Sequence, residues 1–182
     1  MVERILRLIK LDFSVFKEIE ADEKATTEAA IIVLVTTFLS ASGGAVGADR
    51  PLMSFLSAMI SGVVGWIVWS MVTYFISKSF FKGGDTLAQM LRLLGYASAP
   101  NILGALGFIP CFGWLAAFAG AIISLIAGVM AVKEGLDVEL GTAILVAFVG
   151  WIATAIVLGV IGAMFGIAAG IGAGITSLLT NT

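Results

Sequence analysis

Charge is distributed very unevenly along this chain, and that distribution constrains the fold more than any other feature. Four long runs contain no Asp, Glu, Lys or Arg: residues 29–48, 51–77, 93–132 and 140–182. Each run is at least as long as the roughly 20 mostly apolar residues that a helix needs to cross a bilayer. Only 12% of the residues are charged and 60% are apolar, a composition that cannot cover the surface of a soluble domain. The chain is therefore expected to be an integral membrane protein.

The runs predict five transmembrane helices. The third run is too long for one span, and Pro100 and Pro110 interrupt it, so we divide it between two helices. The last run is longer than one tilted helix requires, and we place a span in its first half. The predicted spans are residues 29–48, 51–77, 87–109, 111–132 and 141–163. The predicted fold is all-α, a polytopic membrane helix bundle with five transmembrane helices over residues 29–163.

The positions of Lys and Arg predict the orientation. Five of the ten lie before the first span, three follow the second span and one follows the fourth, whereas Arg50 alone follows the first. Cytoplasmic loops carry the excess of Lys and Arg. Five spans with a cytoplasmic N-terminus place nine of these charges inside and one outside. We therefore expect a multi-pass membrane protein with its N-terminus in the cytoplasm and its C-terminus outside.

Residues 1–28 form a segment of their own, predicted to be a cytoplasmic amphipathic helix over residues 1–20 followed by a polar turn. Apolar and charged side chains fall on opposite faces of this helix, with Asp12 and Glu20 as exceptions on the apolar side. A basic amphipathic helix is typical of the membrane interface. One interpretation is an anchor or partner-binding helix, and the other is a lead-in packed on the bundle. The candidate interface residues are Arg4, Arg7, Lys10, Phe13 and Phe16.

A polar break interrupts the third predicted span. Pro100 cannot donate a backbone hydrogen bond, and the carbonyl freed one turn earlier is within reach of a side chain such as Ser98 or Asn101. One interpretation makes Tyr96, Ser98, Pro100 and Asn101 a polar pocket or hinge. The other is a kinked helix held by inter-helix hydrogen bonds.

The C-terminal tail, residues 164–182, is rich in glycine. It is either a continuation of the last span, a re-entrant piece or a short sixth helix. Gly162, Gly166, Gly170 and Gly174 recur every four residues and share one helix face. Small residues at this spacing let helix backbones approach closely. This face is a candidate interface with a membrane-protein partner or a second copy, or else it packs within the chain.

The same scarcity of polar groups argues against most catalytic and metal-binding sites. The chain has no His and one Cys, so it lacks the commonest general base and the Cys or His clusters of metal sites. No ionisable residue falls at the centre of a predicted span, which argues against a proton-coupled transporter and an intramembrane hydrolase. We expect no enzymatic activity, no cofactor, no metal and no nucleic-acid partner.

Three segments resemble the Yip family, the Ypt/Rab-interacting membrane proteins, in its short prokaryotic form. They are residues 15–23 (VFKEIEADE), residues 95–100 (GYASAP), and residues 133–137 (KEGLD) followed by 141–143 (GTA). The resemblance covers about residues 10–160. It implies five spans with a cytoplasmic N-terminus and an outside C-terminus, which agrees with the charge count, and the short prokaryotic form implies a prokaryotic plasma membrane. Eukaryotic members are implicated in vesicle traffic and Rab binding through a longer N-terminal region than the 28 residues found here, so Rab binding is not carried over.

These observations lead to two hypotheses from different classes. The first is a non-enzymatic membrane protein that acts as a scaffold, partner-binding protein or accessory subunit, embedded in the lipid bilayer beside a membrane-protein partner or a second copy. The alternative is a small channel or transporter with a polar path near Tyr96, Ser98 and Asn101.

Overall fold

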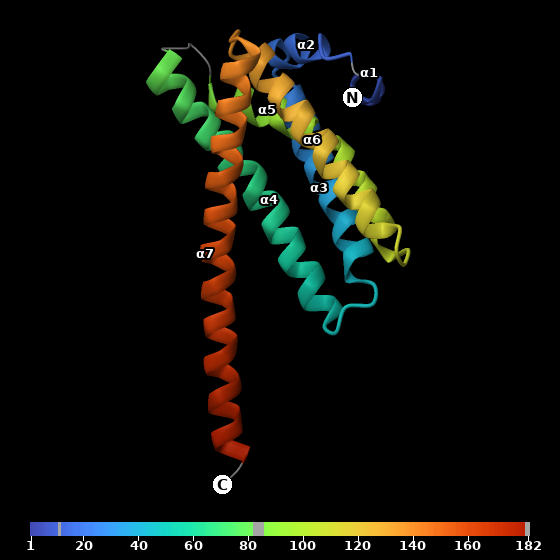
Figure 1. Cartoon of the computed structure of the whole chain (residues 1–182), viewed down its shortest axis with the longest axis vertical. Coiled ribbons are helices and arrows are strands. Elements are labelled where there is room, and N and C mark those ends of the chain that lie inside the picture. Colours follow the sequence, from blue (N-terminus) through green and yellow to red (C-terminus); the bar gives the residue numbers. More distant parts are fainter. Residues whose placement is uncertain (11, 82–85, 181–182) are drawn as a thin grey trace.

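The computed structural model describes residues 1–10, 12–81 and 86–180, apart from the side chains of Ile9, Phe81 and residues 164–180. Its regular elements within these ranges are all helical (Figure 1). They are α1 (Val2–Ile9), α2 (Val15–Ala21), α3 (Ala25–Ala45), α4 (Pro51–Ile76), the π-helix η1 (Ser77–Phe81), α5 (Leu87–Ala97), the 3₁₀-helix η2 (Ala99–Phe108), α6 (Gly113–Gly135) and α7 (Leu140–Thr180). The predicted all-α membrane helix bundle is confirmed.

Four helices in the described part of the chain are long and apolar enough to cross a membrane. They span Ala25–Ala45, Pro51–Phe80, Gly113–Gly135 and Leu140–Ala163, close to four of the predicted spans. The third predicted span is instead divided into α5 and η2. Rises of about 1.5 and 2.0 Å per residue give these two helices a combined length of about 36 Å, enough for a bilayer core of about 30 Å. The count of five crossings stays a prediction that this length supports.

The division between α5 and η2 lies at the predicted polar break. A 3₁₀-helix pairs each N–H with the carbonyl three residues earlier, so Pro100 leaves the carbonyl of Ala97 without that partner. The hydroxyl of Ser124 on α6 donates to this carbonyl at 2.8 Å. The hydroxyl of Ser98 donates to the carbonyl of Gly95 at 2.6 Å. Side chains from the same break and from a neighbouring helix thus satisfy the interrupted backbone.

Helix η2 lies between α3 and α6, and glycines bring the three backbones together. A Cβ atom on Gly43 of α3 would lie 2.5 Å from the carbonyl oxygen of Ala105, and one on Gly120 of α6 would lie 2.7 Å from that of Pro100. Side chains at either position would push the helices apart. These three helices form an inner layer. In an apolar stretch of 18 residues within each of α3 and α6, 39% of the residues are buried.

Helices α4 and α7 form an outer layer. In the corresponding 18-residue apolar stretches, only 11% of the residues of α4 and 17% of those of α7 are buried. Helix α7 is continuous from Leu140 to Thr180 and extends far beyond the other helices in Figure 1. In the described structure, the Gly-rich tail up to Thr180 is therefore a continuation of the last helix.

The charged segments gather at one end of the bundle, where α1 and α2 lie across the helix ends (Figure 1). Lys17 of α2 pairs with Asp137, in the turn between α6 and α7, at 2.5 Å. Arg92 of α5 donates to the backbone carbonyl of Glu20 at 2.8 Å. Arg50 lies at the opposite end, before α4. Lys82 and Asp85 lie outside the described residues.

Candidate functional site: a capped end and a polar cavity

The N-terminal segment folds as two short helices packed on the bundle, and not as one helix over residues 1–20. The chain turns between α1 and α2, where the carboxylate of Asp12 accepts hydrogen bonds from the backbone N–H and the hydroxyl of Ser14. Such local side-chain bonds favour a turn over a helix. Asp12, an exception on the apolar face of the predicted helix, thus takes part in the turn that ends it.

The apolar side of this segment is buried within the chain. Phe16 and Ile19 are fully buried, and Phe13 stacks on Phe16 with ring centroids 6.3 Å apart. The ring of Phe16 is therefore covered by the bundle in this structure. We call α1, α2 and the turn that joins them the cap.

The two arginines of the cap bind carboxylates of the same chain. Arg4 donates to Asp22 at 2.7 Å and to Glu28 at 3.2 Å. Arg7 donates to Asp12 at 2.8 Å and to Glu18 at 2.6 Å. The Arg4 guanidinium, with a further hydrogen bond from the backbone N–H of Lys24, lowers the pKa of the Asp22 carboxyl. These pairs neutralise much of the predicted basic face, while Lys10 remains exposed.

Tyr96 is linked to the cap through Glu28, although its sequence position predicts a polar pocket. Its side chain is fully buried, and its hydroxyl donates to the carboxylate of Glu28 at the start of α3. Glu28 also accepts from Arg4 and lies 3.4 Å from the N-terminal ammonium group. Tyr96 therefore connects the third predicted span to the charged end of the molecule.

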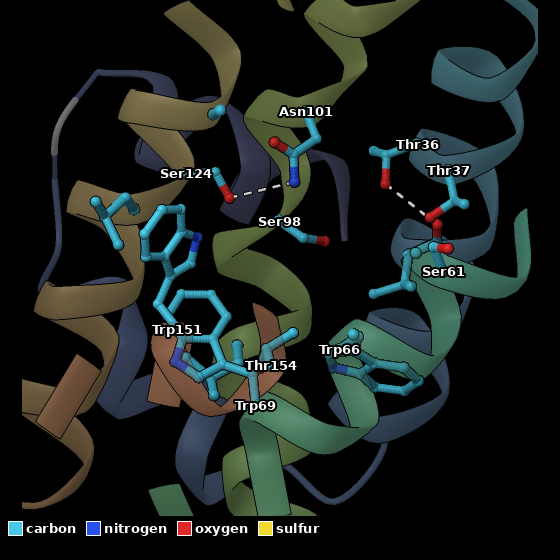
Figure 2. A pocket seen from close by; sticks show the side chains of 16 residues that line it. Thr36, Thr37, Ser61, Trp66, Trp69, Ser98, Asn101, Ser124, Trp151 and Thr154 are labelled. Atoms are coloured by element: carbon cyan, nitrogen blue, oxygen red, sulfur yellow. Dashed lines mark hydrogen bonds between the residues drawn. The ribbon is translucent and has the colours of Figure 1, made fainter. Parts of the chain in front are cut away.

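A cavity of about 240 Å³ lies deeper in the bundle, between the inner and outer layers (Figure 2). Helices α3, α4, α6 and α7 and the break between α5 and η2 all contribute to its wall. Its hydrogen-bonding residues are Thr36, Thr37, Ser61, Trp66, Trp69, Ser98, Asn101, Ser124, Trp151 and Thr154. Among the described residues that line it, none is ionisable. The wall can therefore bind neutral polar groups or water but offers no countercharge for an ion.

Internal hydrogen bonds already hold part of this wall in place. Asn101 donates from its amide nitrogen to the hydroxyl of Ser124 at 3.3 Å, as Figure 2 shows. The indole N–H of Trp66 donates to the carbonyl of Leu91 at 3.0 Å. An amide has a second N–H and an oxygen acceptor, so Asn101 keeps hydrogen-bonding capacity beyond its bond to Ser124.

Trp69 of α4 lies between α6 and α7 and bounds the cavity. A Cβ atom on Gly128 would lie 3.0 Å from Cζ2 of the indole, and one on Gly150 would lie 2.6 Å from Nε1. The two glycines thus form a slot that an indole fills. Among the described buried polar atoms, Nε1 of Trp69 and the hydroxyl of Thr73 have no hydrogen-bond partner.

The structure brings together only part of the predicted pocket. Ser98 and Asn101 line the cavity, whereas the carbonyl of Pro100 packs against Gly120 and Tyr96 bonds to Glu28 at the charged end. The cavity also includes the hydroxyl residues of α3, α4 and α7 and is bounded by the Trp69 slot, which were not predicted from the sequence. The sequence signal that could have indicated these residues is the presence of hydroxyl side chains near the middle of several predicted spans, because groups at the same depth can meet across a bundle.

The glycine face of the tail is described only in part. Gly162 is exposed, and a Cβ added there would meet nothing within 4 Å. The surroundings of Gly166, Gly170 and Gly174 lie outside the described residues. Within the described part of the chain, no group of three His, Cys, Asp or Glu side chains is placed to hold a metal ion.

Comparison with known proteins agrees with this architecture. The family model of the Yip1 domain matches residues 12–161, which include the cap's second helix, the inner layer and most of the outer layer. An uncharacterized protein of the archaeon Methanocaldococcus jannaschii is 28% identical over 111 residues, covering 52% of this chain and 78% of the relative. No solved structure matches the chain. The chain belongs to the Yip family of multi-pass membrane proteins, defined by the Yip1 domain.

Proposed function

We propose that this chain is a non-enzymatic membrane scaffold that binds other membrane proteins, or a second copy of itself, through the exposed sides of α4 and α7. The observation that carries the proposal is the difference between the layers. In the 18-residue apolar stretches of α4 and α7, 11% and 17% of the residues are buried, against 39% in those of α3 and α6. These helices therefore offer long apolar sides that either lipid or another transmembrane helix can cover.

The buried apolar side of the cap supports a different role for this segment. Its arginines pair with carboxylates of the same chain, and its aromatic rings pack on the bundle. We infer that the cap fastens the cytoplasmic ends of the helices together. The exposed Lys10 and the outward side of α1 are left for the membrane surface or a partner.

Native mass spectrometry of the purified protein in nanodiscs tests the scaffold proposal. A defined oligomer, or a defined partner that co-purifies from native membranes, is the expected result. A monomer under all extraction conditions, with no partner at a fixed ratio, would contradict it.

We also propose that the charged end faces the cytoplasm of a prokaryotic cell, with five crossings and an external C-terminus. The gathering of the described Lys and Arg side chains at the capped end, except Arg50, supports this orientation. A reporter fused after the last residue should be active only outside. A reporter active in the cytoplasm would indicate a sixth crossing or the opposite orientation.

A second candidate is a small channel or transporter, and the polar cavity favours it. Substrate flux into liposomes that is lost on Asn101→Leu would support this alternative. Because no ionisable side chain lines the described wall, its substrate would be neutral.

A further inference from the structure

We propose that the cavity beside Trp69 binds the neutral hydrogen-bonding group of a membrane-dissolved amphiphile, such as the hydroxyl of a long-chain alcohol, which enters from the bilayer between α6 and α7. This inference depends on neither function proposed above, because binding without flux or a protein partner would still establish it.

The cavity lies near the middle of the long apolar helices that line it, and so near the middle of a bilayer that these helices cross. Ser124 is the central residue of α6 (Gly113–Gly135), about 16 Å from either end at 1.5 Å per residue. Thr36 occupies a similar position in α3 (Ala25–Ala45). A charged headgroup at this depth would need a countercharge, which the described wall does not supply. A hydroxyl or carbonyl group needs only hydrogen-bond partners.

The cavity is open toward the hydrocarbon. Helices α6 and α7 meet at the short turn between them and diverge away from it, as Figure 1 shows. The Trp69 indole lies between Gly128 and Gly150 and keeps the two helices apart at this level. Beyond it, Ala121 of α6 and Trp151 of α7 line the cavity and are both exposed, Trp151 to 54%. A ligand can therefore arrive sideways from the lipid.

The size and chemistry of the cavity fit one end of such a molecule. A volume of about 240 Å³ equals roughly eight waters at about 30 Å³ each. That space accommodates a polar group and the first carbons of a chain, with the remaining chain lying in the opening among lipids. Asn101, with its spare N–H and oxygen, is the residue best placed to recognise the polar group because its amide both donates and accepts.

Photolabelling of the full chain in phosphatidylcholine nanodiscs tests this site. The probes are diazirine analogues of hexadecanol and of hexadecane, and peptide mass spectrometry maps the adducts. We expect the alcohol analogue to label cavity peptides about tenfold more than the hydrocarbon, the factor that one net hydrogen bond provides. Unlabelled hexadecanol should compete, and hexadecane should not.

Two matched variants locate the site. Ala121→Trp should block the opening and abolish cavity labelling. Ala117→Trp, one helical turn away on an exposed position outside the lining, should retain it. Asn101→Leu should reduce the preference for the alcohol to that of the hydrocarbon.

Equal labelling by both probes, or labelling that hexadecanol cannot displace, would overturn the proposal and leave a cavity holding only water or lipid chains. Labelling that persists in a folded Ala121→Trp variant would also overturn it. If that variant does not fold, the competition between alcohol and hydrocarbon in the parent protein decides the question.

Discussion

The indole of Trp69 occupies the space that a side chain on Gly128 would need. Gly150 bounds the other edge of the same ring, so the indole cannot move away from α6 without meeting α7. One aromatic side chain thereby sets the separation of two helices and, with it, the opening of the cavity.

A methyl group in this slot should destabilise the bundle. Gly128→Ala introduces a Cβ against a ring that is held on both sides, and overpacking of this kind costs about 1–3 kcal/mol. Gly159→Ala is the matched control on α7, because a Cβ there meets nothing within 4 Å. Unfolding free energies in mixed micelles should fall for the first variant and stay level or rise for the second. Equal values for both would contradict the slot.

Removing an unpaired hydroxyl should have the opposite effect from removing a paired one. Thr73→Val keeps the shape of the side chain and eliminates a buried hydroxyl that has no partner among the described residues. We expect it to be neutral or stabilising. Ser124→Ala removes the donor to the Ala97 carbonyl and should cost about 1–3 kcal/mol, because that carbonyl is then left unsatisfied. The same unfolding assay measures both, and a larger loss for Thr73→Val would contradict this account.

The two tyrosines of the chain should respond differently to loss of their hydroxyls. Tyr96→Phe removes a buried hydrogen bond to the Glu28 carboxylate and should cost about 1.5–3 kcal/mol. Tyr74 accepts a hydrogen bond from the exposed Lys78, so Tyr74→Phe should change stability little. Thermal melts of the two variants in one detergent compare them directly. Identical melting temperatures would show that the Tyr96–Glu28 bond does not stabilise the folded protein.

Acid should loosen the cap. The Arg4 guanidinium lowers the pKa of Asp22 in the folded protein, so ionised Asp22 stabilises the cap above the ordinary Asp value of about 4. This contribution is lost as the pH falls through the lowered native pKa. A spin label on Val2→Cys, with Cys111→Ser to remove the native thiol, should become more mobile below about pH 4. Asp22→Asn should already be more mobile at neutral pH. A label whose mobility does not change with pH in the parent would contradict this prediction.

The sequence predicted the four long apolar helices, because a charge-free run of about 20 mostly apolar residues is long enough to cross a bilayer. It also predicted the break at Pro100, since proline removes a backbone donor in any context. The 3₁₀ form of η2 could not be predicted in the same way. In the structure η2 lies in close backbone contact with Gly43 and Gly120, and such contacts exist only once α3 and α6 pack around it.

The same distinction between local signals and contacts of distant residues applies to the candidate site. Ser98 and Asn101 are polar residues beside a proline, a local signal, and both line the cavity. The partner of Tyr96 lies 68 residues away at Glu28, and the Trp69 slot needs glycines from two other helices. Such pairs depend on helix register and rotation, which hydropathy does not specify.

Site-specific photocrosslinking in native membranes tests the scaffold proposal most directly. Photoreactive residues at Leu56 of α4 and Ile156 of α7 probe the proposed contact sides, and Phe118 on α6 is the matched control; the three are exposed by 46%, 61% and 57%. We predict discrete protein adducts at Leu56 and Ile156 and only lipid adducts at Phe118. Lipid adducts alone at all three positions would contradict the account.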